Sequence, residues 1–452
     1  MNIQCFQEPN PLLTPIQQIM LNRGIPLDKQ DRWLHAGTGE INDWRAFGEG
    51  LMKEACAMLD KHIKAADDIC LIVDSDCDGY TSSAILINYL TLINPTYAAD
   101  HLKWKHHESK QHGFNDMLEE LIKTNCKMII SPDGGTNDIA AHDELKEADI
   151  DVLVLDHHLA EGGEIDGTSA CVVNVQTCDY PNKSLTGAGV VWQFCRAYEE
   201  LYGDNNQGLV WGLIDLCAIG NIGDMSDYRE LETRAIVNIG MAHLGGSLGL
   251  EQPVNAFLKA MADKNAYTLD KRGGLNYRSC AFGIVPFINA VTRSATQKEK
   301  ELVFNSMLFL LAFSDVKSTK RGVKGTVVKL YEEAVLVCDR VKRRQTKDQD
   351  LALSNIKNII EQEELLDNKV LVIPIEGDAC RQEIVGLAAN KVQAQYQKPC
   401  LIGRRLVDAD GNDIYSGSGR NYSMCEIEDF KSQVASTNTT ISQAGQLLLN
   451  IV

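Results

Sequence analysis

The sequence contains no long hydrophobic run, no closely spaced cysteine pair and no apolar leader. Its most apolar stretch, from Leu302 to Phe313, is too short to span a bilayer and carries Asn305 and Ser306. The 14 cysteines are scattered without a C-x-x-C pair, which argues against a structural zinc site and favours reduced thiols. The N-terminus, MNIQCFQEPNPLL, lacks the basic start and apolar core of a secretory signal. We therefore expect a cytoplasmic protein without a membrane segment.

Basic residues are also in deficit. The chain has 44 Lys and Arg against 62 Asp and Glu, a net charge of −18, which argues against nonspecific coating of nucleic acid. One segment reverses this balance, because Val316 to Lys347 holds ten basic and three acidic residues. The segment is either a solvated helix face or a local nucleic-acid-binding groove, and its composition leaves both open. The length of 452 residues suggests two or three domains.

Three short apolar runs predict buried strands of a parallel sheet. They are Ile69 to Val73, Lys127 to Ile130 and Asp151 to Leu155, and helix-length segments separate them. This alternation is typical of βαβ units and predicts an α/β fold. Each run ends at a polar cluster. Because the carboxyl ends of parallel strands meet at one edge of a sheet, we expect these clusters to share a crevice.

The first cluster is DSDCDG, in which Asp74, Asp76 and Asp78 alternate with other residues. The spacing resembles the start of an EF-hand, but the twelfth position is Ile85 instead of a bidentate glutamate. The triplet alone fits a helix-capping turn equally well. A second glycine motif, GAGVVW from Gly187, lacks the third glycine of a dinucleotide-binding loop.

The other clusters extend the triplet into a candidate metal site. The second strand leads to Asp133, the third to Asp156, His157 and His158, and a later helical stretch to Asp224. Several carboxylates with one imidazole suit Mn²⁺ or Mg²⁺ better than Zn²⁺ or Ca²⁺. Their mutual repulsion requires cations, and two paired metals are a common device for phosphoryl transfer. The candidate ligands are Asp76, Asp78, Asp133, His157 and Asp224.

Four segments, DSDCDGYTSSAIL, SPDGGTND, VLDHH and AIGNIGDMSD, resemble the successive motifs of the DHH phosphoesterase family. Further segments, YPNKSLTGAGVVWQF, FGIVPFINAVTR and YSGSGR, are similar to the RecJ-type single-strand exonuclease branch. The resemblance covers about residues 12–430. It implies a lead-in (1–50), a DHH catalytic domain with a central parallel sheet (51–315), a basic linker with a long connecting helix (316–367), and a smaller α/β DHH-associated domain that binds nucleic acid (368–452). We expect YSGSGR to form a Gly-rich turn in that last domain.

The resemblance also implies roles for individual residues. Asp76 would bind one metal, Asp78 and His157 the other, Asp133 would bridge them and Asp224 would complete a site. His158 would face the scissile phosphate as a donor or acid, Asp156 would orient the adjacent imidazole, and Asp74 would ligate or orient. The implied nucleic-acid contacts are Ser418, Gly419, Arg420, Arg293, Asn289 and Arg381.

The chain departs from the family pattern at several positions. Ile72 stands where many relatives have a histidine, so one metal would have fewer ligands, and Phe287 stands where an arginine is frequent. Arg381 and Gln382 stand where the family often has a His-Glu pair, and the chain stops about where relatives begin a further oligonucleotide-binding barrel. His106, His107 and His112 could contact a terminal phosphate or lie in an exposed loop without function, and we leave both open.

We therefore predict a two-metal exonuclease that digests single-stranded DNA, 5′ to 3′, into mononucleotides, in DNA repair, recombination or replication. An alternative within the family is a phosphodiesterase of short oligonucleotides or cyclic dinucleotides, which the missing barrel favours. A metal-free replication scaffold is the non-enzymatic alternative, and the full set of carboxylates argues against it. The expected cofactors are two Mn²⁺ or Mg²⁺ ions. The expected partners are single-stranded DNA and, for access to it, a single-strand-binding protein or a helicase.

Overall fold

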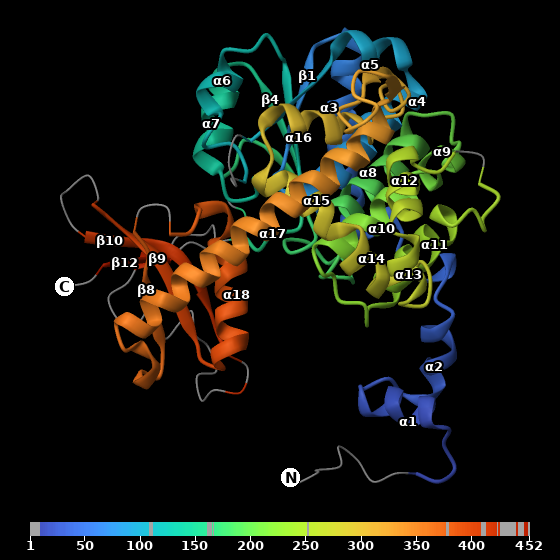
Figure 1. Cartoon of the computed structure of the whole chain (residues 1–452). Coiled ribbons are helices and arrows are strands. Elements are labelled where there is room, and N and C mark those ends of the chain that lie inside the picture. Colours follow the sequence, from blue (N-terminus) through green and yellow to red (C-terminus); the bar gives the residue numbers. More distant parts are fainter. Residues whose placement is uncertain are drawn as a thin grey trace.

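The chain folds into two α/β bodies joined by one long helix (Figure 1). The structure is a computed structural model that describes residues 10–107, 112–160, 165, 167–250, 253–376, 379–407, 413–422, 424, 440–441 and 447–450. The long helix, α17 (Leu330–Gln362), runs from the larger N-terminal body to the smaller C-terminal one. Two short helices, α1 (Pro15–Asn22) and α2 (Leu27–Leu34), extend away from the larger body. None of the described helices combines the length and the apolar character that crossing a membrane requires.

The larger body contains a five-stranded, fully parallel sheet in the order β2-β1-β3-β4-β5. The predicted α/β class with a central parallel sheet is therefore confirmed. The strands are β1 (Ile69–Val73), β2 (Leu102–His106), β3 (Met128–Pro132), β4 (Asp151–Asp156) and β5 (Cys171–Asn174). All five residues of β1 are buried, as expected for a central strand that is covered on both faces.

The alternation of side chains along β1 shows how the two faces are covered. Ile69, Leu71 and Val73 belong to the main core, which contains residues of α3, α4, α8 and α10. Cys70 and Ile72 point to the opposite face and belong to a smaller core under α6 and α7. The helices of this body are α3 (Glu49–Ala65), α4 (Cys77–Ile93), α5 (Pro95–His101), α6 (Leu118–Ile122), α7 (Ile139–Glu147), α8 (Gly187–Leu201), α9 (Gln207–Trp211), α10 (Ile214–Gly223), α11 (Leu231–Leu244), α12 (Ala256–Lys264), α13 (Ala266–Asp270), α14 (Tyr277–Gly283), α15 (Val285–Ser294) and α16 (Gln297–Asn305).

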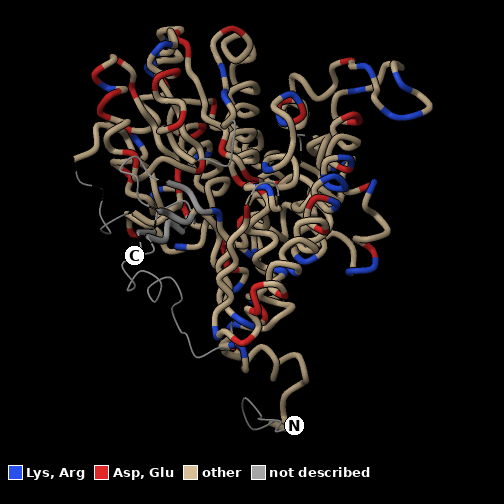
Figure 2. The backbone as a smooth tube through the Cα atoms, turned by 60° about the vertical axis from the view of Figure 1, so that its left-hand side comes forward, with Lys and Arg blue, Asp and Glu red and all other residues tan. Residues whose placement is uncertain are grey.

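The basic segment from Val316 to Lys347 folds in two parts. Its first part is a two-stranded hairpin of β6 (Asp315–Lys317) and β7 (Val327–Lys329), and its second part is the first half of α17. The hairpin is closed by hydrogen bonds from Ser318 N to Thr326 O and from Gly325 N to Ser318 O. It lies at the end of α17 that is remote from the C-terminal body (Figure 1). Figure 2 shows a projecting loop on which Lys and Arg gather.

The C-terminal body is a second five-stranded sheet, in the order β11-β12-β10-β9-β8, packed against α18 (Val385–Tyr396). β8 (Leu371–Pro374) pairs parallel with β9 (Cys400–Val407), and the other pairs are antiparallel. The remaining elements are β10 (Asp413–Arg420), β11 (Thr440–Ile441), β12 (Leu447–Asn450) and the 3₁₀ helices η1 (Thr38–Glu40), η2 (Trp44–Phe47), η3 (Leu365–Asp367) and η4 (Gln382–Ile384).

The expectation that YSGSGR forms a turn is wrong. Residues 415–420 lie within β10 and pair with β9 along its length. The glycine at 417 serves a close approach of two strands, because a Cβ atom there would lie 2.0 Å from the carbonyl oxygen of Ile402. The backbone N–H groups of this segment therefore belong to a sheet, and side chains are left to contact a ligand.

We expect Gly417→Ala to destabilise the C-terminal body by more than about 2 kcal/mol, because the new methyl group overlaps the backbone of the neighbouring strand. Thermal unfolding followed by circular dichroism measures the effect. Gly50→Ala is the matched control, since a Cβ at Gly50 meets no atom within 4 Å. Equal melting temperatures for the Gly417→Ala variant and the wild type would contradict the strand pairing described here.

Candidate metal centre

Polar loops at the carboxyl ends of β1, β3 and β4 meet at one edge of the parallel sheet. Asp74 follows β1 directly, Asp133 follows β3, and Asp156 is the last residue of β4. All three side chains are buried, at 2% exposure or less. Asp133 has a left-handed backbone conformation, with φ of 69°, which is rare for a residue other than glycine and is typical of functional loops. The polar clusters that the strand order predicted to meet therefore lie together at this edge of the sheet.

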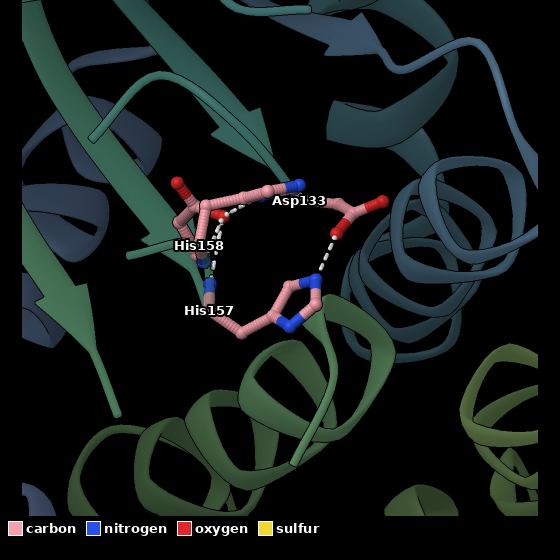
Figure 3. A group of neighbouring side chains, drawn as sticks. Asp133, His157 and His158 are labelled. Atoms are coloured by element: carbon pink, nitrogen blue, oxygen red, sulfur yellow. Dashed lines mark hydrogen bonds and ion pairs between the residues drawn. The ribbon is translucent and has the colours of Figure 1, made fainter. Parts of the chain in front are cut away.

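His157 lies at the centre of one group of carboxylates. Its Nε2 atom is 3.1 Å from Asp133 Oδ1, 3.7 Å from Asp224 Oδ2 and 3.8 Å from Asp78 Oδ2. Figure 3 shows the ring of His157 turned toward Asp133, away from His158. One imidazole nitrogen and three carboxylate oxygens that converge in this way can surround a single divalent cation.

A second group of potential ligands lies beside the first. Asp74, Asp76 and Asp133 each present a carboxylate oxygen, and these oxygens lie within 4.8 Å of one another. Asp133 belongs to both groups. A shared carboxylate is what a pair of neighbouring cations needs as a bridge.

Helix N-termini position two of the carboxylates. Asp76 is the N-cap of α4 and accepts hydrogen bonds from the backbone N–H groups of Asp78 and Gly79. Asp78 accepts hydrogen bonds from Gly187 N at 2.7 Å and Ala188 N at 3.1 Å, at the start of α8. It also accepts one from the Thr186 hydroxyl at 2.9 Å. These bonds turn Asp78 toward α8, so it is the most strongly held member of the first group.

Two other carboxylate oxygens of the site lack such partners. Asp133 Oδ1 and Asp74 Oδ1 are buried and accept no hydrogen bond from the protein. Burial, and then the charges of neighbouring carboxylates, raise the pKa of Asp133 and Asp78 well above the usual range. These carboxylates are buried, repel one another and have unsatisfied oxygens, so they fit divalent cations. A bound cation would favour the ionised form of each carboxylate.

His158 and Asp156 form a separate pair beside this centre. His158 Nδ1 lies 2.8 Å from Asp156 Oδ1, and Asp156 also accepts hydrogen bonds from Thr136. Burial lowers the pKa of His158, but the hydrogen bond and charge of Asp156 outweigh it and raise the pKa to about 9. Because Asp156 takes Nδ1, the Nε2 atom of His158 is left for a ligand, and its side chain is 48% exposed.

Two residues near Asp74 were not among the predicted site residues. His112 Nδ1 lies 2.8 Å from Asp74 Oδ2, and His107 Nε2 lies 3.9 Å from Asp74 Oδ1. His107 is buried, and this excludes the exposed-loop alternative for it. The register of β2 carried the signal: Val73 pairs with His106, which places His107 opposite Asp74. The neighbouring His106 packs instead against Tyr80 and Phe304.

Three of the predicted nucleic-acid contacts lie between the metal centre and the C-terminal body. Asn289 Oδ1 accepts a hydrogen bond from Cys77 N, in the loop that carries Asp76. Arg293 lies one turn later on α15, and its Nε is buried without a hydrogen-bond partner. Burial first, and then the charge of Arg293, lower the pKa of both Arg420 and Lys342. Arg293, Lys342 and Arg420 therefore form a cluster of cations, and no ion pair joins any of them to a described carboxylate.

The other predicted contacts are arranged differently. Ser418 Oγ and Gly419 O both accept hydrogen bonds from Arg420 Nη1, so they orient the guanidinium group. Arg381 is held by ion pairs to Asp348 at 3.2 Å and Glu383 at 3.5 Å. In α17, Arg340 and Arg344 pair with Glu299, and Arg343 pairs with Asp339. Arg343 is thus paired within α17, and Arg340 and Arg344 are paired with a glutamate of the neighbouring helix α16.

Comparison with known proteins finds matches over most of this chain. A family model described as "DHH family, N-terminal domain" matches residues 68–221. YorK of Bacillus subtilis (strain 168), whose name describes an SPbeta prophage-derived single-strand DNA-specific exonuclease, is 32% identical over 424 residues. The match covers 94% of this chain and 68% of YorK. The single-stranded-DNA-specific exonuclease RecJ of the same organism is 25% identical over 418 residues, which are 90% of this chain and 46% of that protein.

Solved structures show the same fold. A crystal structure of exonuclease RecJ bound to manganese matches with a TM-score of 0.64 at 20% identity, over 89% of this chain and 90% of that one. RecJ of Thermus thermophilus in complex with Mn²⁺ matches with a TM-score of 0.62 at 19% identity, over 89% of this chain and 52% of that one. This chain therefore spans about half the length of the Bacillus and Thermus RecJ proteins.

We expect Mn²⁺ to raise the melting temperature by several degrees, because a cation that binds only the folded state adds about 2.7 kcal/mol at 100 times its dissociation constant. Asp133→Asn should abolish this increase. Its melting temperature without metal should equal or exceed that of the wild type, since the substitution removes a repelling charge. Asp149→Asn, in an 89% exposed side chain, is the control and should keep the increase. A full Mn²⁺ effect in Asp133→Asn would contradict the shared-ligand geometry.

Proposed function

The chain belongs to the DHH family, within its single-strand DNA-specific exonucleases, and from that membership we propose that it is a divalent-metal-dependent phosphodiesterase of single-stranded DNA. The observation that carries the proposal is the position of Asp133. Its carboxylate belongs to both groups of potential ligands, so a pair of cations can sit beside one phosphate.

The two groups divide the ligands as follows. Asp78, His157 and Asp224 would hold one cation, Asp74 and Asp76 would hold the other, and Asp133 would bridge them. When bound, the cations would supply Lewis acidity and neutralise the charge that develops on the phosphate. Asp78 gains rigidity from three hydrogen bonds at α8. Asp74 and Asp133 are buried, so little bulk water competes with a cation for their oxygens.

His158 would act on the leaving group. Asp156 holds its Nδ1 atom, so Nε2 can face the scissile phosphate and donate a proton to the departing oxygen. Asp156 itself is completely buried and accepts hydrogen bonds from the backbone N–H groups of His157 and His158. It thereby orients the ring of His158 and fixes the backbone of His157, and we assign it a positioning role.

The DNA strand would leave the metal centre along α15. Asn289 marks the start of this path beside the loop of Asp76, and Arg293 lies on the same helix four residues later. Arg293, Lys342 and Arg420 would then bind successive phosphates, and this would relieve their mutual repulsion. A path with walls in both bodies would admit a single strand and exclude a duplex by its width.

The finer details of the activity belong to the same proposal. Digestion would proceed 5′ to 3′ and release mononucleotides, in DNA repair, recombination or replication. A single-strand-binding protein or a helicase would provide access to single strands. The described cysteines form no disulfide, as suits a cytoplasmic enzyme.

A long single strand, labelled at its 5′ or its 3′ end and incubated with Mn²⁺ or with EDTA, tests the reaction. We expect immediate release of the labelled mononucleotide from the 5′ end, lost in EDTA and in Asp133→Ala. Early release of the 3′ label would mean that digestion runs 3′ to 5′. An inert long strand beside a cleaved dinucleotide would favour the short-oligonucleotide alternative, and hydrolysis of neither would sink the proposal.

The double variant Arg293→Gln, Arg420→Gln tests the path of the strand. We expect KM for a single strand of about 30 nucleotides to rise at least tenfold. The slope of the logarithm of the binding constant against the logarithm of salt concentration should become less negative by about 1.4, which is about 0.7 for each lost phosphate contact. Mn²⁺ binding should not change, because neither residue belongs to the ligand groups. Arg45→Gln, Arg229→Gln is the control, with the same loss of charge at exposed ion pairs. Equal KM values for the two double variants would exclude the path.

A further inference from the structure

Asp74 faces a second buried imidazole that has no assigned role. Its partner is His107, whose side chain has no exposed surface. His107 follows the last residue of β2, and the parallel pairing of Val73 with His106 brings it opposite Asp74. The adjacent ring, His106, lies among aromatic side chains and makes no contact with the carboxylates.

The hydrogen bonds of His107 show which ring nitrogen is free. Its Nδ1 atom lies 2.9 Å from Asp116 Oδ1 and 3.0 Å from Asp116 Oδ2. A carboxylate only accepts, so Nδ1 donates its proton to Asp116, and in the neutral imidazole Nε2 then presents a lone pair. A carboxylate that holds one imidazole nitrogen while the other points into a site is the arrangement that fixes a metal-ligating histidine.

The lone pair of His107 Nε2 points at another unsatisfied acceptor. Nε2 lies 3.9 Å from Asp74 Oδ1, and both atoms are buried without a hydrogen-bond partner. The second oxygen of Asp74 is occupied, since His112 Nδ1 lies 2.8 Å from Oδ2. Two buried acceptors that face each other are unfavourable unless a positive charge lies between them.

A divalent cation satisfies this geometry. Two ligand atoms at about 2.1 Å from one cation lie about 3.0 Å apart at a right angle and about 4.2 Å apart in line. The observed 3.9 Å falls within these limits. Ile72, on the neighbouring strand, has no atom that could serve as a ligand.

We infer that His107 Nε2 is a ligand of the cation held by Asp74, Asp76 and Asp133, and that Asp116 and His112 are its positioning residues. Each of the two cations then has one imidazole ligand, His157 for the first and His107 for the second. A nitrogen ligand strengthens the binding of Mn²⁺ more than that of Mg²⁺. The protein should therefore discriminate in favour of Mn²⁺ at both positions. This inference rests on the proposed function only for the presence of the cations.

The test counts the imidazole nitrogens bound to Mn²⁺. The full chain is loaded with Mn²⁺ without nucleic acid, and electron spin-echo envelope modulation measures the ¹⁴N coupling, while titration calorimetry measures affinity. We expect coupling from two histidines in the wild type and from one in His107→Phe, with the Mn²⁺ affinity of one site lowered at least about tenfold. The preference for Mn²⁺ over Mg²⁺ at that site should fall with it.

His142→Phe is the matched control, because His142 is also buried, its ring packs against Phe114, and its Nδ1 bonds to the Thr168 hydroxyl instead of to a carboxylate. It should keep both nitrogen couplings. Asp116→Ala is a second variant that leaves the ring of His107 in place, and it should lower the Mn²⁺ affinity of the same site. Unchanged ¹⁴N coupling and affinity in a folded His107→Phe variant would overturn the inference. Mn²⁺ binding is measured without a substrate, so an absence of exonuclease activity would affect the proposed function alone.

Discussion

The repulsion among buried carboxylates at the edge of the parallel sheet is the constraint on which the rest of the structure depends. Asp74, Asp78 and Asp133 are each at most 2% exposed, and burial raises the pKa of all three. Such a cluster cannot be stable through its own contacts, because each charge raises the cost of the next. The fold holds the carboxylates in place through rigid surroundings, and cations would complete the balance.

Close packing supplies that rigidity, and glycine makes the packing possible. A Cβ atom at Gly187 would lie 2.5 Å from Asp133 Oδ1, and one at Gly79 would lie 2.4 Å from Asp74 Cβ. The N-terminus of α8 therefore approaches the carboxylates closely enough for its N–H groups to bind Asp78. Helix dipoles offset part of the negative charge, while the unsatisfied oxygens of Asp74 and Asp133 are left for metal.

The sequence allowed the centre of the fold to be predicted better than its edges. The runs at β1, β3 and β4 were recognisable because central parallel strands are continuously apolar. The edge strands β2 and β5 were missed. In β2, with the sequence LKWKH, apolar residues alternate with basic ones, and β5, with the sequence CVVN, is short. Without β2, the sequence did not place His107 beside Asp74, because that position follows from the pairing of β2 with β1. The strand in YSGSGR was missed because glycines usually mark turns, whereas Gly417 allows two strands to come together.

The three cations at the far end of the proposed path of the DNA strand present the opposite imbalance, because their positive charges repel one another. Arg293 comes from α15, Lys342 from α17 and Arg420 from β10, so three elements of both bodies bring like charges together. Burial first, and then the charge of Arg293, lower the pKa of the other two, so a bound anion would favour the charged forms of this cluster. The net charge of −18 does not prevent such a cluster from binding an anion. Interactions between exposed charges that are more than about 10 Å apart are largely screened at ordinary ionic strength. A phosphodiester strand bound at the cations and metal ions bound at the carboxylates would relieve both imbalances. Binding of the strand and binding of the metal ions would therefore each make the other more favourable.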